Sequence, residues 1–293
     1  MMRMEEFEKS IKDLVSEKMG FHATVVEATG MNGIAHRSLL IDNGTNVSPC
    51  IDLNQLLRFL EEGGNDVEEV MTQLCCQITE SNKLSNHIRP WIESSLSKEY
   101  MLQNCHFQIL NAQRNRELLC EAVSAPFFDL AGIVKVRVHQ GSYEFSYTVT
   151  EPLCQALHMT KEELLSAAMV NLEKTSFQIV RVEDFTGDPY IEDEKNALFV
   201  ATNEQALHGA SILLYPDKIF GLAEKMGMDL YILPSSIHEV LLISERCGRA
   251  EEELRDLVHA VNTSALKETD YLSDSIYKTD IRHKTIYICE PPM

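Results

Sequence analysis

A short segment in the last third of the chain carries residue types used in hydrolysis. After one proline come two hydroxyls, an imidazole and a carboxylate, at Ser235, Ser236, His238 and Glu239. In a hydrolase-like enzyme His238 would be the general base, Glu239 would orient it, and a serine would be the nucleophile or would bind an anion. Adjacent strand residues point to opposite faces, however, which keeps His238 and Glu239 apart. We therefore favour a proline-shaped turn whose serines bond locally, and no catalytic residue is assigned.

Other chemical signatures are absent from the sequence. It has no phosphate-binding or dinucleotide-binding glycine motif, no Gly-x-Ser-x-Gly elbow, and no second histidine one helical turn after His238-Glu239. His106, His139, His158, His208, His259 and His283 do not follow a metal-ligand spacing. The acidic segment 183–196 lacks the alternating ligands of a calcium loop. The sequence thus predicts neither a cofactor nor a metal.

The charge balance disfavours nucleic acid as a direct partner. The chain has 26 basic and 45 acidic residues, a formal net charge of −19, and no lysine or arginine cluster. Such a surface repels phosphate backbones. An acidic surface could instead mimic DNA toward a basic protein. The carboxylates lie singly or in runs of at most three, which is typical of solvated helix faces.

The predicted location is the cytoplasm. No run of about 18 apolar residues could span a membrane, and the charged first residues do not resemble a signal peptide. Eight scattered cysteines without a Cys-x-x-Cys pair favour reduced thiols over disulfides. We expect no association with a membrane.

The first hundred residues predict a small helical and hairpin module. An amphipathic helix over 4–19 precedes two strand-like segments, 22–28 and 34–41, around an Asn-Gly turn, and 47–51 could add an edge strand. A helical pair follows over 53–60 and 67–78. The polar segment 81–100, which contains Pro90, is expected to be a connection with one short helix.

The remainder alternates between helical and strand patterns. Asn111 is expected to cap a helix that the Ala125-Pro126 step closes near 122. The clearest strands, 130–139 and 143–149, form an antiparallel hairpin, and Thr160 with Glu163 matches a helix capping box. The other expected strands are 177–182, 198–201, 210–214, 230–233, 240–243 and 286–289, and the other expected helices begin near 150, 216 and 250.

These elements predict an α+β fold with a mostly antiparallel or mixed sheet flanked by helices. We place the domains at 1–104, for the N-terminal helix, hairpin and helical pair, and 105–293, for the main α+β domain. A single continuous domain is the alternative.

The segment Tyr231-Ile-Leu-Pro-Ser-Ser-Ile-His-Glu-Val240 resembles an uncharacterised family of Gram-positive anaerobic, clostridial and gut-type bacteria, carried as a domain of unknown function. Further similar segments are 111–119 (Asn-x-x-x-Asn-x-Glu-Leu-Leu), 130–138 and 262–274, so the resemblance extends through most of the chain. It implies a bacterial cytoplasmic protein associated with mobile elements, and assigns no activity to Ser235, Ser236, His238 or Glu239.

We therefore expect a non-enzymatic protein-binding or regulatory protein, whose partner is another protein of basic or neutral charge. The two alternatives are a hydrolase-like enzyme built around His238 and an acidic DNA-mimic inhibitor. The oligomeric state, the substrate and the identity of the partner do not follow from the sequence.

Overall fold

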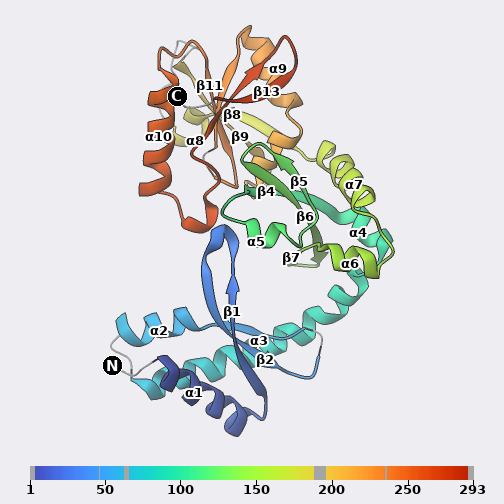
Figure 1. The fold of residues 1–293 in the computed structure, drawn as a ribbon, viewed down its shortest axis with the longest axis vertical. Coiled ribbons are helices and arrows are strands. Elements are labelled where there is room, and N and C mark those ends of the chain that lie inside the picture. The colour runs from blue at the N-terminus through green and yellow to red at the C-terminus, as the bar shows by residue number, and fades with distance from the viewer. Residues whose placement is uncertain (1–3, 46, 63–65, 188–195, 235, 290–293) are drawn as a thin grey trace. The chain divides into compact units, whose positions relative to one another are not determined.

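The chain forms two compact units, Met1–Leu96 and Ser97–Met293 (Figure 1). The computed structural model describes residues 4–45, 47–62, 66–187, 196–234 and 236–289. No helix within these ranges is both long and apolar enough to cross a membrane. Whether the units are separate domains, with the boundary predicted near 104, stays a prediction.

The N-terminal unit begins with the predicted helix and hairpin. Helix α1 (Met4–Leu14) continues as a π-helical turn to Met19 and ends at Gly20, which has a left-handed φ of 70°. Strands β1 (His22–Thr29) and β2 (Ala35–Asp42) pair antiparallel, and the short β3 (Cys50–Asp52) pairs with β2. Positive φ at Asn32 and Gly33 makes the tight turn, as the Asn-Gly pattern predicts.

Two helices complete this unit. They are α2 (Leu53–Glu62) and α3 (Val67–Ser95), and α3 starts with a capping box between Asp66 and Glu69. Apolar side chains of α1, the hairpin and both helices share one core, made of Phe7, Ile11, Val15, Leu39, Ile41, Ile51, Leu53, Leu56, Val70, Leu74 and Ile78.

The predicted polar connection over 81–100 was wrong, because α3 continues through Pro90 to Ser95. A proline inside a helix removes one backbone hydrogen bond and costs about 3 kcal/mol. A helix nucleated by the buried stripe from Val70 to Ile78 nevertheless gains one bond for each residue added, so it can extend into polar sequence.

The C-terminal unit contains a four-stranded antiparallel sheet. Strand β6 (Leu130–Gln140) pairs on one side with β4 (Cys105–Asn111) and on the other with β5 (Ser124–Phe127) and β7 (Tyr143–Thr148). Helices α4 (Lys98–Asn104), α6 (Glu151–Ala156) and α7 (Lys161–Glu173) accompany it, and α7 packs on β4. The hairpin from β6 to β7 and the capping box at Thr160 confirm the sequence prediction.

The helix predicted from Asn111 to about 122 was wrong. Only one helical turn forms, α5 (Arg116–Leu119), and the Ala125-Pro126 step lies in β5. The Asn111 side chain accepts a bond from the Arg114 amide and donates one to the Leu272 carbonyl, which favours a turn there. Pro126 is tolerated because β5 is an edge strand.

The same unit contains a six-stranded antiparallel sheet of order β13-β12-β10-β11-β9-β8. Its strands are β8 (Phe177–Arg181), β9 (Leu198–Asn203), β10 (Leu230–Leu233), β11 (Val240–Ser244), β12 (Ile276–Asp280) and β13 (Thr285–Cys289). Its helices are α8 (Val182–Thr186), α9 (Asp217–Met226) and α10 (Glu251–Ser264). The predicted strand over 210–214 was wrong, because Gly209–Leu214 is a buried 3₁₀ helix. A short apolar run cannot distinguish a strand from a buried helical segment.

Both faces of the six-stranded sheet are covered by other elements. One face shares the main core with the four-stranded sheet, and α10 packs on the other against Tyr231, Leu233 and Ile276. The Asp129 carboxylate ties the two sheets together by accepting hydrogen bonds from Ser273, Ser275 and Tyr277. The predicted α+β class, with antiparallel sheets flanked by helices, is confirmed.

Candidate functional site

The turn between β10 and β11 places Ser236 and Glu239 together. Ser236 is only 2% exposed, and its Oγ donates to Glu239 Oε1 at 2.8 Å and accepts from the His238 amide at 3.0 Å. A backbone bond from Ser236 N to Glu239 O closes the turn at 3.2 Å. The serine thus bonds within its own turn. Ser235 lies outside the described residues.

The His238 ring has a different set of partners. Its Nδ1 accepts a hydrogen bond from the His208 amide at 3.2 Å, and its Nε2 lies 3.7 Å from Asp270 Oδ1. Because Nδ1 is an acceptor, the proton of the neutral ring is on Nε2, facing the carboxylate. Asp270, and not its sequence neighbour Glu239, is therefore the acid that faces this imidazole. The catalytic roles considered for Ser236, His238 and Glu239 stay predictions.

The turn that carries His208 is held in a strained conformation. Ala206 and His208 have φ of 49° and 56°, in the left-handed region that non-glycine residues rarely adopt. Thr202 Oγ1 donates to the His238 carbonyl at 2.8 Å, and Gly209 lies so close that a Cβ there would be 2.6 Å from that carbonyl oxygen. Strain of this kind persists only where the surroundings enforce it, and it clusters at functional sites.

Two basic side chains, Lys135 and Arg137, influence the buried histidines. The rings of His208 and His238 stack with centroids 5.6 Å apart. Burial, reinforced by the charge of Lys135, the neighbouring His238 ring and the charge of Arg137, lowers the pKa of His208 to about 4. Burial together with Arg137 and Lys135 likewise lowers the pKa of His106 to about 4. Both rings are therefore neutral at pH 7.

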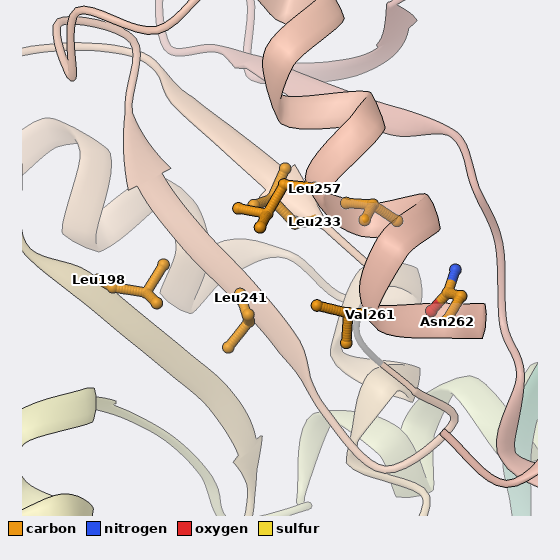
Figure 2. Close-up of a pocket in the computed structure, with 7 residues that line it drawn as sticks. Leu198, Leu233, Leu241, Leu257, Val261 and Asn262 are labelled. Carbon is orange, nitrogen blue, oxygen red and sulfur yellow. The ribbon is translucent and has the colours of Figure 1, made fainter. Parts of the chain in front are cut away.

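An apolar cavity of about 240 Å³ lies between the six-stranded sheet and α10, and we call it the α10 groove. Figure 2 shows Leu198 and Leu241 on the strands and Leu257 and Val261 on the helix around this space. The full lining is Leu198, Leu233, Leu241, Leu257, Val258, Val261 and Asn262. Six of these seven side chains are hydrocarbon, so the groove offers almost only apolar contact.

The helix that forms one wall of the α10 groove carries both exposed apolar and exposed acidic side chains. Leu257 and Val261 are 45% and 40% exposed although they line an apolar cavity. Glu252, Glu253 and Asp256 are exposed on the same helix. An apolar groove whose wall helix also carries carboxylates suits an amphipathic cationic ligand.

The family profile described as "Family of unknown function (DUF5688)" matches residues 4–280. The chain belongs to this family. No curated protein and no solved structure matches the chain. The expected membership of a family of unknown function is thereby confirmed, while the host range and the motif stay predictions.

In this DUF5688 protein, segments distant in sequence meet around His238. The segment 262–274 contributes Asp270, which faces His238, and the Leu272 carbonyl, which accepts a hydrogen bond from the Asn111 side chain. The segment 130–138 contributes Lys135, whose charge acts on the neighbouring His208. Within the ranges that the structure describes, no group of three or more histidines, cysteines or acids could hold a metal.

Sequence reasoning located His238 but missed its partners. Asp270 and His208 are 32 and 30 positions away, and neither carries a local motif. The α10 groove was also missed, although Leu257 and Val261 continue the apolar stripe of Leu254 and Val258 along this helix. That spacing was the one available signal.

Proposed function

We propose that this protein binds another protein through the α10 groove, and that its partner presents a cationic amphipathic helix. The observation that carries the proposal is the apolar cavity between α10 and the strands, whose lining includes the exposed Leu257 and Val261. Apolar side chains left accessible in a concave site favour an interaction surface over a solvated one.

The size of the groove supports a protein partner. Pockets for small organic ligands commonly have volumes of about 300–1,000 Å³, and this cavity has about 240 Å³. It therefore suits a few aliphatic anchor side chains better than a complete cofactor. Helix-in-groove recognition uses such anchors at positions i, i+3, i+4 and i+7.

The charge of the molecule supports a cationic partner. The net charge is −19, and Glu252, Glu253 and Asp256 stand on the helix that forms one wall. Lysines or arginines on the polar face of a partner helix would gain attraction there, whereas an acidic helix would be repelled.

The test uses two synthetic helical peptides with the same leucine face, one with lysines and one with glutamates on the polar face. Fluorescence anisotropy measures their binding to the full chain. We expect the lysine peptide to bind saturably, with affinity that falls as salt is raised, and the glutamate peptide to bind at least about tenfold more weakly.

Variants separate groove binding from general attraction to an acidic protein. Leu257→Gln with Val261→Gln should weaken binding of the lysine peptide about tenfold or more, because both anchor contacts are lost. Val170→Gln, at an exposed apolar residue of α7, is the matched control and should leave binding unchanged. Equal affinity for the two peptides, or an unchanged affinity of the double variant, would contradict the proposal.

We further propose that this binding takes place in the cytoplasm, without a role for a membrane or for nucleic acid, in a Gram-positive anaerobic host. All eight cysteines are free thiols, which suits a reducing compartment. Cell fractionation with an antibody against the chain tests the location. Recovery in the culture medium or the envelope would contradict it.

A further inference from the structure

A cluster of basic side chains stands out on this acidic protein. His106 and Lys135 are directly opposite each other on β4 and β6, so their side chains leave the same face of the sheet, and Arg137 follows two residues later on that face. The 3₁₀ helix that follows His208 packs against β4. Three histidines and two cations are thus gathered with Asp270 as the acid that faces His238.

Lys135 is the unusual member of this group. It is half-buried, and no carboxylate of a described residue lies within ion-pair distance of its ammonium group. Arg137, by comparison, pairs with Glu144 at 3.2 Å. Burial lowers the pKa of Lys135, which is the expected response of a cation that has lost water without gaining a counter-charge. A bound anion would supply that counter-charge.

One neighbouring polar atom also lacks a partner. Gln108 Oε1 is buried without a hydrogen bond, and Gln108 lies two residues from His106 on β4, so both side chains point to the same face. The His106 ring itself bonds to the Asn104 backbone. Buried polar atoms in proteins are normally bonded, so the unbonded Gln108 oxygen suggests that a ligand or water supplies the missing donor. A ligand that carries a donor beside its negative charge would satisfy both Gln108 and Lys135.

We propose that His106, Gln108, Lys135 and His208 form a binding site for the oxyanion of a small molecule, either a carboxylate or a phosphate group. Lys135 provides the charge, the imidazoles bond to the oxygens of the anion, and Gln108 accepts a hydrogen bond from a donor on the ligand or from a water bound with it. His238, fixed between Asp270 and the His208 amide, holds His208 in place as a positioning residue. This site is separate from the α10 groove in its residues and in its chemistry.

Binding at this site should be coupled to proton uptake. Burial keeps the rings of His106 and His208 neutral, and Lys135, Arg137 and the neighbouring imidazoles reinforce this effect. Asp270 acts in the opposite direction on His208, because its negative charge favours the protonated ring. An anion bound beside Lys135 offsets the positive charges, so it raises the pKa of both histidines. The affinity for the anion therefore rises as the pH falls from 7 toward 5.

The test is a titration of the full chain with inorganic phosphate and, separately, with acetate, at constant ionic strength set by sodium chloride. The imidazole resonances of His106 and His208 report binding in NMR spectra. Saturable shifts with phosphate alone assign the site to phosphate groups, and saturable shifts with acetate alone assign it to carboxylates. Both results support the proposal, and the absence of saturation with either anion would overturn it.

Three lysine variants complete the test. Lys135→Met should weaken anion binding about tenfold or more, and Lys135→Arg should restore most of the affinity because it keeps the charge. Lys174→Met removes an exposed lysine and is the matched control. The Lys135→Met protein should remain folded, because the substitution removes an unpaired half-buried charge. A free energy of unfolding in denaturant equal to that of the wild type verifies this. Unchanged anion affinity in a folded Lys135→Met protein would overturn the proposal.

Discussion

Gly209 marks the closest approach of the backbone beside His238. A Cβ at this position would lie 2.3 Å from Thr202 Oγ1, 2.6 Å from the His238 carbonyl oxygen and 2.7 Å from the Asn203 amide nitrogen. Two of these three atoms belong to the backbone and cannot rotate away. Gly209→Ala should therefore lower the free energy of unfolding by about 1–3 kcal/mol, measured by urea denaturation.

Gly221→Ala is the matched control for that prediction. Gly221 lies in α9, and no atom is within 4 Å of the position where its Cβ would be. Alanine favours a helix over glycine by about 0.5–1 kcal/mol, so this variant should be neutral or more stable. Destabilisation of the two variants to the same degree would show that the close contact at Gly209 does not exist.

The two buried imidazoles predict a loss of stability in acid. Their pKa in the folded chain is about 4, below the ordinary value of about 6.5 that they regain on unfolding. The unfolded chain therefore takes up protons first as the pH falls, so their contribution to stability is complete above about pH 6.5 and declines toward pH 4. Urea denaturation at several pH values measures this decline.

A His106→Gln variant tests the cause of this acid sensitivity. It removes one titrating group and retains a polar side chain, so its unfolding free energy should fall less between pH 6.5 and pH 4 than that of the wild type. An exposed histidine supplies the control, because His139→Gln should keep the full decline. Parallel pH profiles for wild type and His106→Gln would rule out this residue as a source.

At this scale the sequence predicted the position of the candidate site and not its contacts. The Pro234–Glu239 pattern indicated a turn with locally bonded hydroxyls, and Ser236 bonds in that way. The bonds of the His238 ring come instead from Asp270 and His208, which reach it through tertiary packing. Contacts of this kind cannot be predicted from the residues next to His238 in the sequence.

Among the elements, local signals were reliable where local interactions decide the structure. Alternation of apolar residues predicted the hairpin of β6 and β7, and the Asn-Gly turn predicted that of β1 and β2. Two of the failures have a tertiary cause. Asn111 is drawn into a bond with the Leu272 carbonyl, and β12 was overlooked because it is defined by pairing with β10 and β13.

The capping box of α7 gives an element-scale prediction. Thr160 Oγ1 accepts from the Glu163 amide at 3.1 Å, and the Glu163 carboxylate accepts from the Thr160 amide at 2.9 Å. Thr160→Ala removes the first bond and should lower the free energy of unfolding by about 1 kcal/mol. Thr160→Ser keeps the hydroxyl and should match the wild type. A Thr160→Ser variant as unstable as Thr160→Ala would contradict this account of the helix start.

For the whole molecule, the position of the domain boundary is a prediction that truncation can test. The internal contacts divide the chain after Leu96, and α4 packs against α7 and β6 with Met101 fully buried. We therefore expect residues 97–293 to fold as a separate domain, and to be more stable in urea than residues 105–293, which lack α4. Equal stability would favour the boundary near 104, and failure of both to fold would favour a single continuous domain.

The most direct test of protein binding is hydrogen exchange of the full chain, with and without the lysine-faced amphipathic peptide. Bound peptide should slow amide exchange in α10 and in β9 and β11, because the groove between them becomes covered. The glutamate-faced peptide should leave these rates unchanged. Slowed exchange elsewhere in the chain, with α10 unaffected, would contradict the assignment of the α10 groove as the binding surface.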